Sequence, residues 1–125
     1  MDITPLLPAG RQVVEAYGDG GFRVSGEDYR GSVLVFPEVT LAWPVAAIGE
    51  LSAASLAPVT ARDAAIDLLL VGCGARMALI DPAVRGEVRA DGVVIEAMDT
   101  GAACRTYNVL MAEGRAVAAA LIAVD

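Results

Sequence analysis

The chain has 125 residues, a mass of 12.8 kDa and a net charge of −7, with nine basic and sixteen acidic residues. All nine basic residues are arginine, so the sequence contains neither lysine nor histidine. This composition excludes Schiff-base catalysis, histidine-dependent nucleophilic catalysis and a Walker phosphate loop. The hydrophobic share of 56% excludes a disordered chain, and the length predicts a single domain covering residues 1–125.

The charge and the apolar runs also limit the partners. An acidic chain is repelled by phosphate backbones and anionic lipid surfaces, which excludes nucleic acid as an expected partner. The longest apolar run, residues 116–124, is too short to span a bilayer as a helix, and the first residues do not match a signal peptide. We therefore expect a cytoplasmic protein without a transmembrane segment. In that compartment Cys73 and Cys104 are expected to be reduced thiols, and two thiols without histidine do not predict a metal site.

The first third of the chain has the pattern of short strands joined by tight turns. Strands are expected at residues 12–17, 22–25, 32–36 and 39–43, and glycine-rich turns at residues 18–21 and 26–31. The pattern predicts an antiparallel meander with one face on the core. These N-terminal β-hairpins are expected to extend or cover a larger sheet.

From residue 52 onward the hydrophobic period changes. Ser52 is expected to cap a short helix over residues 52–56, whose length Pro58 limits. The remaining expected elements are strands at residues 66–71, 93–98 and 116–124 and a helix at residues 82–90. Residues 99–101 are expected to cap a second helix, which runs to residue 113. Strands that alternate with helices predict parallel βαβ crossovers. The predicted fold is an α/β domain of three layers with a mixed, largely parallel central sheet.

Polar residues gather where a predicted strand ends and the last helix begins. Ligands usually bind at the carboxyl ends of strands in such folds, free helix N–H groups attract anions, and Arg105 adds a bidentate donor. Gly72–Gly74 follow the neighbouring strand and are expected to form the facing wall of a cleft. The candidate site for an anion or a partner comprises Gly72, Cys73, Gly74, Asp99, Thr100, Gly101, Cys104, Arg105, Thr106 and Asn108.

Each of these residues also has an ordinary structural interpretation. Asp99 and Thr100 are expected to cap the helix, and Arg105 to pair with a nearby acid. Cys104 has two interpretations: a thiolate activated by the helix start and Arg105, or a buried structural cysteine, which the absence of a histidine base favours. Gly72–Met77 begin like a dinucleotide fingerprint, but Met77 occupies the position of the third glycine. We therefore predict no catalytic residue, no cofactor and no metal.

The sequence also carries a family resemblance over residues 12–124. Met-Asp-Thr-Gly-Ala-Ala-Cys-Arg-Thr-Tyr-Asn-Val-Leu at residues 98–110, followed by residues 112–115 and 117–121, closely resembles the C-terminal signature of the MTH-type small domain family. Residues 17–24, 29–35 and 69–74, together with Trp43, agree with it. This family of uncharacterised domains includes mitochondrial NADH:ubiquinone oxidoreductase (complex I) assembly factor 3 and an adipogenesis-associated protein. The resemblance implies a three-layer fold with a mixed sheet and no established reaction.

Two classes of function follow. The resemblance, together with the missing catalytic bases, favours a non-enzymatic assembly or interaction protein whose partners are respiratory-complex subunits or other assembly proteins. The alternative is a binder or enzyme for a small anionic ligand at the Gly72–Gly74 turn and the helix start at residues 100–108. Whether the chain forms a homo-oligomer stays open.

Overall fold

The structure, a computed structural model, describes residues 10–61 and 66–125. The eight strands are β1 Val14–Gly18, β2 Gly21–Val24, β3 Glu27–Arg30, β4 Val33–Val35, β5 Thr40–Ala42, β6 Leu68–Gly72, β7 Val94–Met98 and β8 Val117–Leu121. The helices are α1 Ala57–Thr60, α2 Pro82–Ala90 and α3 Thr100–Ala112, and the short 3₁₀ turns are η1 Ile48–Glu50 and η2 Ala54–Leu56. These counts refer to the described ranges.

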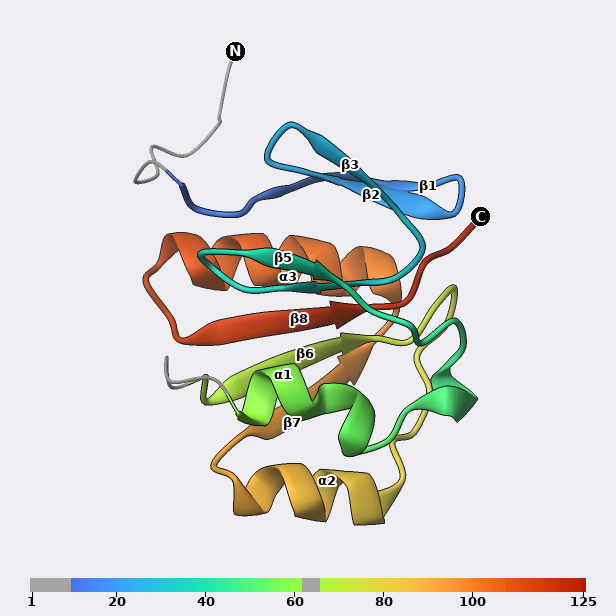
Figure 1. The fold of residues 1–125 in the computed structure, drawn as a ribbon, viewed down its shortest axis with the longest axis vertical. Coiled ribbons are helices and arrows are strands. Elements are labelled where there is room, and N and C mark those ends of the chain that lie inside the picture. Colours follow the sequence, from blue (N-terminus) through green and yellow to red (C-terminus); the bar gives the residue numbers. More distant parts are fainter. Residues whose placement is uncertain (1–9, 62–65) are drawn as a thin grey trace.

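The central sheet has five strands in the order β5-β4-β8-β6-β7. Strands β8, β6 and β7 are parallel, and β4 and β5 add an antiparallel pair beside β8. Helix α3 covers one face of this sheet, while α1 and α2 lie on the other face (Figure 1). The predicted α/β class with a mixed central sheet is confirmed. Every residue of β8 is buried, as its continuous apolar sequence predicts.

The N-terminal strands both cover and extend this sheet. Strands β1, β2 and β3 form a separate antiparallel sheet that lies over the outer side of α3, whereas β4 and β5 join the central sheet (Figure 1). The predicted single meander is therefore divided between two sheets. The chain passes from one sheet to the other at Gly31, whose φ of +79° allows the turn.

The predicted turn over residues 26–31 is wrong, because residues 27–30 form strand β3. Ser25 and Gly26 have φ angles of 45° and +85°, the two positive values of a type I′ hairpin turn, and Val24 pairs directly with Glu27. Two residues are enough for this turn, so the polar segment that follows pairs with β2. Asp19 and Gly20, with φ angles of 52° and 77°, make the equivalent turn between β1 and β2.

The helix predicted over residues 52–56 is also placed wrongly. The structure has the 3₁₀ turn η2 there, and its N-cap Ala53 has no side-chain cap. Ser52 does accept a hydrogen bond from the amide of Ser55 at 3.1 Å, the bond expected of a capping serine, but the turn that it precedes is 3₁₀ and begins at Ala54. Pro58 does not end a helix but lies in the first turn of α1, where a missing amide hydrogen costs nothing. The other two helices match the predicted ranges closely.

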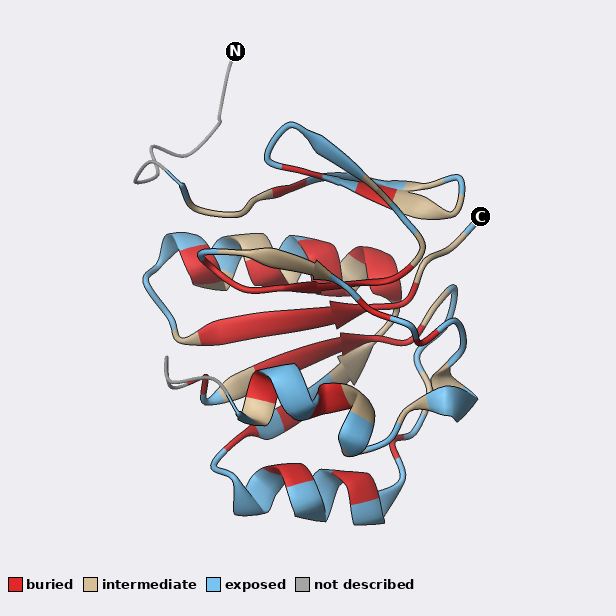
Figure 2. Cartoon of the chain, in the orientation of Figure 1, coloured by how far each residue is buried: buried red, intermediate tan, exposed pale blue. Residues whose placement is uncertain are grey.

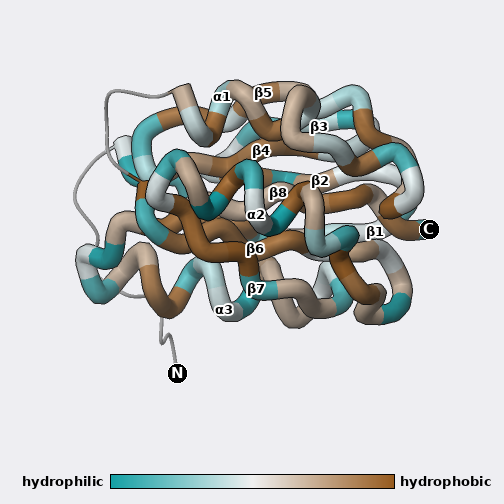
Figure 3. The backbone as a smooth tube through the Cα atoms, turned by 90° about the horizontal axis from the view of Figure 1, so that it is seen from below, coloured by the Kyte–Doolittle hydropathy of each residue, from teal (hydrophilic) through white to brown (hydrophobic). Residues whose placement is uncertain are grey.

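The hydrophobic core lies on both faces of the central sheet. Buried residues, red in Figure 2, lie along β8, β6 and the inner face of α3, and β6 is hydrophobic along its length (Figure 3). Tyr107 of α3 is fully buried, and its hydroxyl donates to the carbonyl oxygen of Gln12 in the N-terminal segment at 3.0 Å. Helix α3 is thus held from both sides, which fixes its N-terminus at the carboxyl ends of the parallel strands.

Candidate functional site

A cleft of about 620 Å³ lies where the parallel strands end and α3 begins. Gly72 at the end of β6 pairs with Met98 of β7 on one side and with Leu121 of β8 on the other, so three strands end together. The following residues line this carboxyl-edge cleft: Tyr17, Ala46, Ala47, Ile48, Cys73, Gly74, Ala75, Asp99, Gly101, Ile122, Ala123, Val124 and Asp125. The cleft lies at the position that the sequence predicts for a site in an α/β fold.

Thr100 holds the three segments that form the floor of this cleft. Its hydroxyl donates to the carbonyl oxygen of Ile122 at 2.7 Å and accepts from the amide of Gly74 at 3.0 Å. Its own amide donates to the carbonyl oxygen of Gly74 at 2.9 Å. The hydroxyl is fully buried and its proton is committed to a carbonyl, so Thr100 is a structural residue of the site and not a nucleophile.

Two glycines allow the close packing around the start of α3. A Cβ added at Gly72 would lie 2.9 Å from the Cα of Thr100, so only glycine lets the helix approach the strand this closely. A Cβ added at Gly101 would collide with the hydroxyl of Tyr17. Tyr17 therefore reaches from β1 over the helix start and forms one wall of the cleft, with 45% of its surface exposed.

The charged side chains that line the cleft are acidic. They are Asp99 and Asp125, and no arginine is among the lining residues that the structure describes. Asp99 caps α3 as predicted, since its Oδ2 accepts from the amide of Ala102 at 3.1 Å. These lining carboxylates do not attract an anion, and Arg105 borders the cleft without lining it, so anion binding stays a prediction from the sequence.

Three of the predicted site residues, Cys104, Thr106 and Asn108, lie away from the cleft, and Arg105 lies at its border. Arg105 is exposed on α3, and its Nη1 would lie 3.3 Å from a Cβ added at Gly101, on the side of the helix that Tyr17 covers. Within the described ranges it forms no ion pair, so the predicted pairing with an acid is wrong. Cys104 is buried in the core and Thr106 is half-buried along the helix. Asn108 lies one turn further: its Oδ1 accepts from the amide of Val14 at 3.0 Å and its Nδ2 donates to the Val14 carbonyl at 2.8 Å. Asn108 thus fixes the edge of β1.

Both cysteines are free and buried. The Sγ of Cys73 lies 3.6 Å from the carbonyl oxygen of Val71, on the wall of the cleft. Burial raises the pKa of Cys104 from 9.0 to about 12, and the nearby Arg105 only partly opposes this effect. Cys104 is therefore a neutral, structural thiol at physiological pH, and the thiolate interpretation is wrong.

This raised pKa couples Cys104 to stability at alkaline pH. The unfolded chain loses the thiol proton near pH 9, whereas the folded chain keeps it to about pH 12, so this contribution is complete below pH 9 and is lost as the pH rises toward 12. Burial also raises the pKa of Tyr107, which adds to the same trend. We expect Cys104→Ala to make the fall of unfolding free energy with pH shallower by up to about 1.4 kcal/mol per pH unit. Urea denaturation between about pH 8 and pH 11 measures both slopes; equal slopes would contradict the burial effect.

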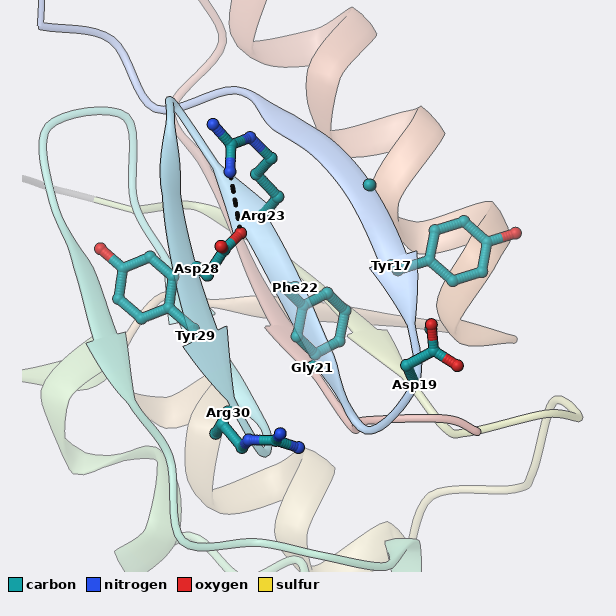
Figure 4. Close-up of a pocket in the computed structure, with 10 residues that line it drawn as sticks. Tyr17, Asp19, Gly21, Phe22, Arg23, Asp28, Tyr29 and Arg30 are labelled. Atoms are coloured by element: carbon teal, nitrogen blue, oxygen red, sulfur yellow. Dashed lines mark hydrogen bonds and ion pairs between the residues drawn. The ribbon is translucent and has the colours of Figure 1, made fainter.

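A second hollow lies on the outer face of the three-stranded sheet (Figure 4). It measures about 450 Å³, and Gly18 and Gly21 among its lining residues leave space there because they have no side chains. Arg23 in this hollow is already engaged, at 3.0 Å from Asp28 and 3.6 Å from Glu15. The hollow therefore presents mixed, largely compensated charges and does not compete with the carboxyl-edge cleft as a candidate site.

The sequence misses three parts of the cleft wall. Tyr17, residues 46–48 and residues 122–125 belong to other elements and reach the cleft only through tertiary packing. The one available signal was Tyr17, which directly precedes the glycine-rich turn of the first hairpin. Over the described ranges, no cluster of three metal-ligating side chains occurs, and no helix has the length and hydropathy needed to cross a membrane.

Comparisons with known proteins place the chain in a family. The family described as "Protein of unknown function (DUF498/DUF598)" matches residues 14–122. The chain belongs to this family. It is 39% identical to an uncharacterised protein of Rhodobacter capsulatus over 91% of this chain and 86% of that protein. The solution structure of a Mth938-like domain from Bordetella pertussis superimposes with a TM-score of 0.78 at 34% identity, covering 98% of this chain and 92% of that one.

Named assembly factors are also among the relatives of this chain. NADH dehydrogenase [ubiquinone] 1 alpha subcomplex assembly factor 3 of Xenopus tropicalis is 36% identical over 87% of this chain. The match covers 60% of that relative, so this chain spans less than two thirds of its length. The resemblance to an MTH-type family that includes complex I assembly factor 3 is thereby confirmed.

Proposed function

We propose that this chain is a non-enzymatic assembly factor that acts through protein contacts in the biogenesis of respiratory complex I. The observation that carries the proposal is the similarity to assembly factor 3, which extends over 87% of this chain. It acts as a single cytoplasmic domain, and its partners are subunits of the complex or other assembly proteins. Because the named relative is longer than this chain, the functions of its remaining part are not carried over.

The chemistry of the candidate site supports contact over catalysis. The Thr100 hydroxyl donates its proton to the Ile122 carbonyl, and the Cys104 thiol is neutral and buried. The sequence supplies no histidine or lysine as a base. The carboxyl-edge cleft exposes backbone, aromatic and carboxylate groups, which can contact a partner protein.

Deletion of the gene in the source organism tests the proposal. We expect the amount of assembled complex I in the membrane, measured by native gel electrophoresis, to fall in the deletion strain while other respiratory complexes keep their level. Re-expression of the wild-type chain should restore the complex. An unchanged level of assembled complex I would contradict the proposal.

A further inference from the structure

The longest exposed apolar side chains of the described residues gather at one end of the molecule. Leu79 is 90% exposed and Met77 is 59% exposed, and both lie on the loop between β6 and α2. Tyr17, 45% exposed, lines the carboxyl-edge cleft at the same end. Covering an apolar side chain as exposed as Leu79 with a partner lowers the free energy. This end of the molecule is therefore a candidate interaction surface.

A third hollow adjoins the cleft along this edge. A groove of about 290 Å³ is lined by Ile48, Gly49, Leu51, Leu79, Ile80, Asp81 and Val84. Ile48 lines both the groove and the cleft, so the two hollows meet at this side chain. The loop after β6, the turn at residues 46–51 and the C-terminal residues lie together at this end of the sheet (Figure 1). We call the combined surface, defined by the lining residues of both hollows, the carboxyl-edge surface.

The charge of this surface selects its partner. The charged residues that line the two hollows are Asp81, Asp99 and Asp125, and none of the described lining residues is basic. Two arginines border this surface without lining either hollow: Arg76 on the same loop, and Arg105, whose Nη1 would lie 3.3 Å from a Cβ added at Gly101. The three carboxylates still outnumber them. Leucine and isoleucine side chains flanked by carboxylates complement a segment that combines apolar anchors with basic residues.

We infer that the carboxyl-edge surface is a docking site for a segment of a partner protein that carries leucine-like side chains beside arginine or lysine. The apolar side chains of the segment enter the groove at Ile48 and Leu79, and its basic side chains face Asp99 and Asp125 in the cleft. The inference rests on the proposed function, because it names the chemistry of the partner that an assembly factor of this kind would hold.

A peptide titration tests the inference with the full chain. The probe is a synthetic peptide of about twelve residues in which leucine pairs alternate with arginine pairs, and its control carries glutamate at every arginine position. We expect the arginine peptide to shift the amide NMR signals of Ile48, Gly74 and Leu79, with binding that weakens as salt increases. The glutamate peptide should produce no such shifts. Equal binding of both peptides, or shifts confined to the outer face of β1–β3, would overturn the inference.

Two matched variants test the contribution of the groove. We expect Leu79→Ser to raise the Kd of the arginine peptide about tenfold and Val109→Ser, which removes a 58% exposed side chain on α3, to change it less than roughly twofold. Both positions are on the surface, so neither variant should unfold the chain. A dimer of the wild-type chain in light scattering that Leu79→Ser abolishes would overturn the inference in favour of a second copy. Peptide docking with normal complex I in the deletion strain would contradict the proposed function alone, and the reverse pair of results would contradict the docking site alone.

Discussion

Replacing Gly72 by alanine is expected to lower the free energy of unfolding by about 3 kcal/mol. The added Cβ would lie 2.9 Å from the Cα of Thr100 and 3.2 Å from the Cδ2 of Leu121. Strand β6 is paired with β7 and β8 at this position, so the backbone of Gly72 cannot move away without breaking the ladder. The small gain in strand propensity from alanine does not offset this collision.

Gly86→Ala is the matched control for this substitution. Gly86 lies inside α2, is exposed, and has open space around the position of a new Cβ. Alanine there should raise the free energy of unfolding by about 0.5–1 kcal/mol. Urea denaturation followed by circular dichroism measures both variants. A Gly72→Ala protein as stable as the wild type would show that the start of α3 does not pack against β6 as closely as described.

Replacing Thr100 by valine is expected to lower the free energy of unfolding by about 2–4 kcal/mol. Valine keeps the shape and burial of the side chain but removes the hydroxyl. The carbonyl of Ile122 and the amide of Gly74 then lose their hydrogen-bond partner. The buried carbonyl stays removed from water with no hydrogen bond to offset the cost. Because the volume stays the same, this loss reports the hydrogen bonds and not a cavity.

Thr106→Val is the control with the same chemical change six residues further along α3. Thr106 is half-buried and, within the described residues, its hydroxyl has no assigned hydrogen bond, so we expect a change of less than about 0.5 kcal/mol. Thr100→Ser, which keeps the hydroxyl, should lose less stability than Thr100→Val. Equal losses for the valine variants at both positions would contradict the role of Thr100 in joining β6, α3 and the segment after β8.

The two longer helices, α2 and α3, could be predicted well because their ends carry local signals. Asp81 followed by Pro82 marks the start of α2, and the side chain of Asp81 does accept from the amide of Ala83 at 2.9 Å. Gly114, with a φ of 80°, follows the end of α3 as predicted. Strand β3 was missed because Glu-Asp-Tyr-Arg has no apolar alternation; its pairing depends on the Ser25-Gly26 turn and on β2.

The candidate site could be predicted only at its floor. The Gly72–Gly74 turn and Asp99–Gly101 meet because the carboxyl ends of parallel strands lie on one edge, which the alternation of elements already implies. The residues further along α3 do not reach the cleft because the helix rises about 1.5 Å per residue away from the strand ends. Cys104 therefore packs in the core, and Asn108, one turn later, contacts β1. Tyr17 and the groove at Ile48 could not be predicted, since only tertiary packing brings them to this edge.

Assembled complex I in membranes of the deletion strain is the quantity that decides whether the chain is an assembly factor. We expect native gels to show less of the intact complex without the chain. Wild-type chain and Gly86→Ala should restore the complex fully, and the destabilised Gly72→Ala should restore it less. A deletion strain with a wild-type amount of intact complex I would contradict an assembly role for this protein.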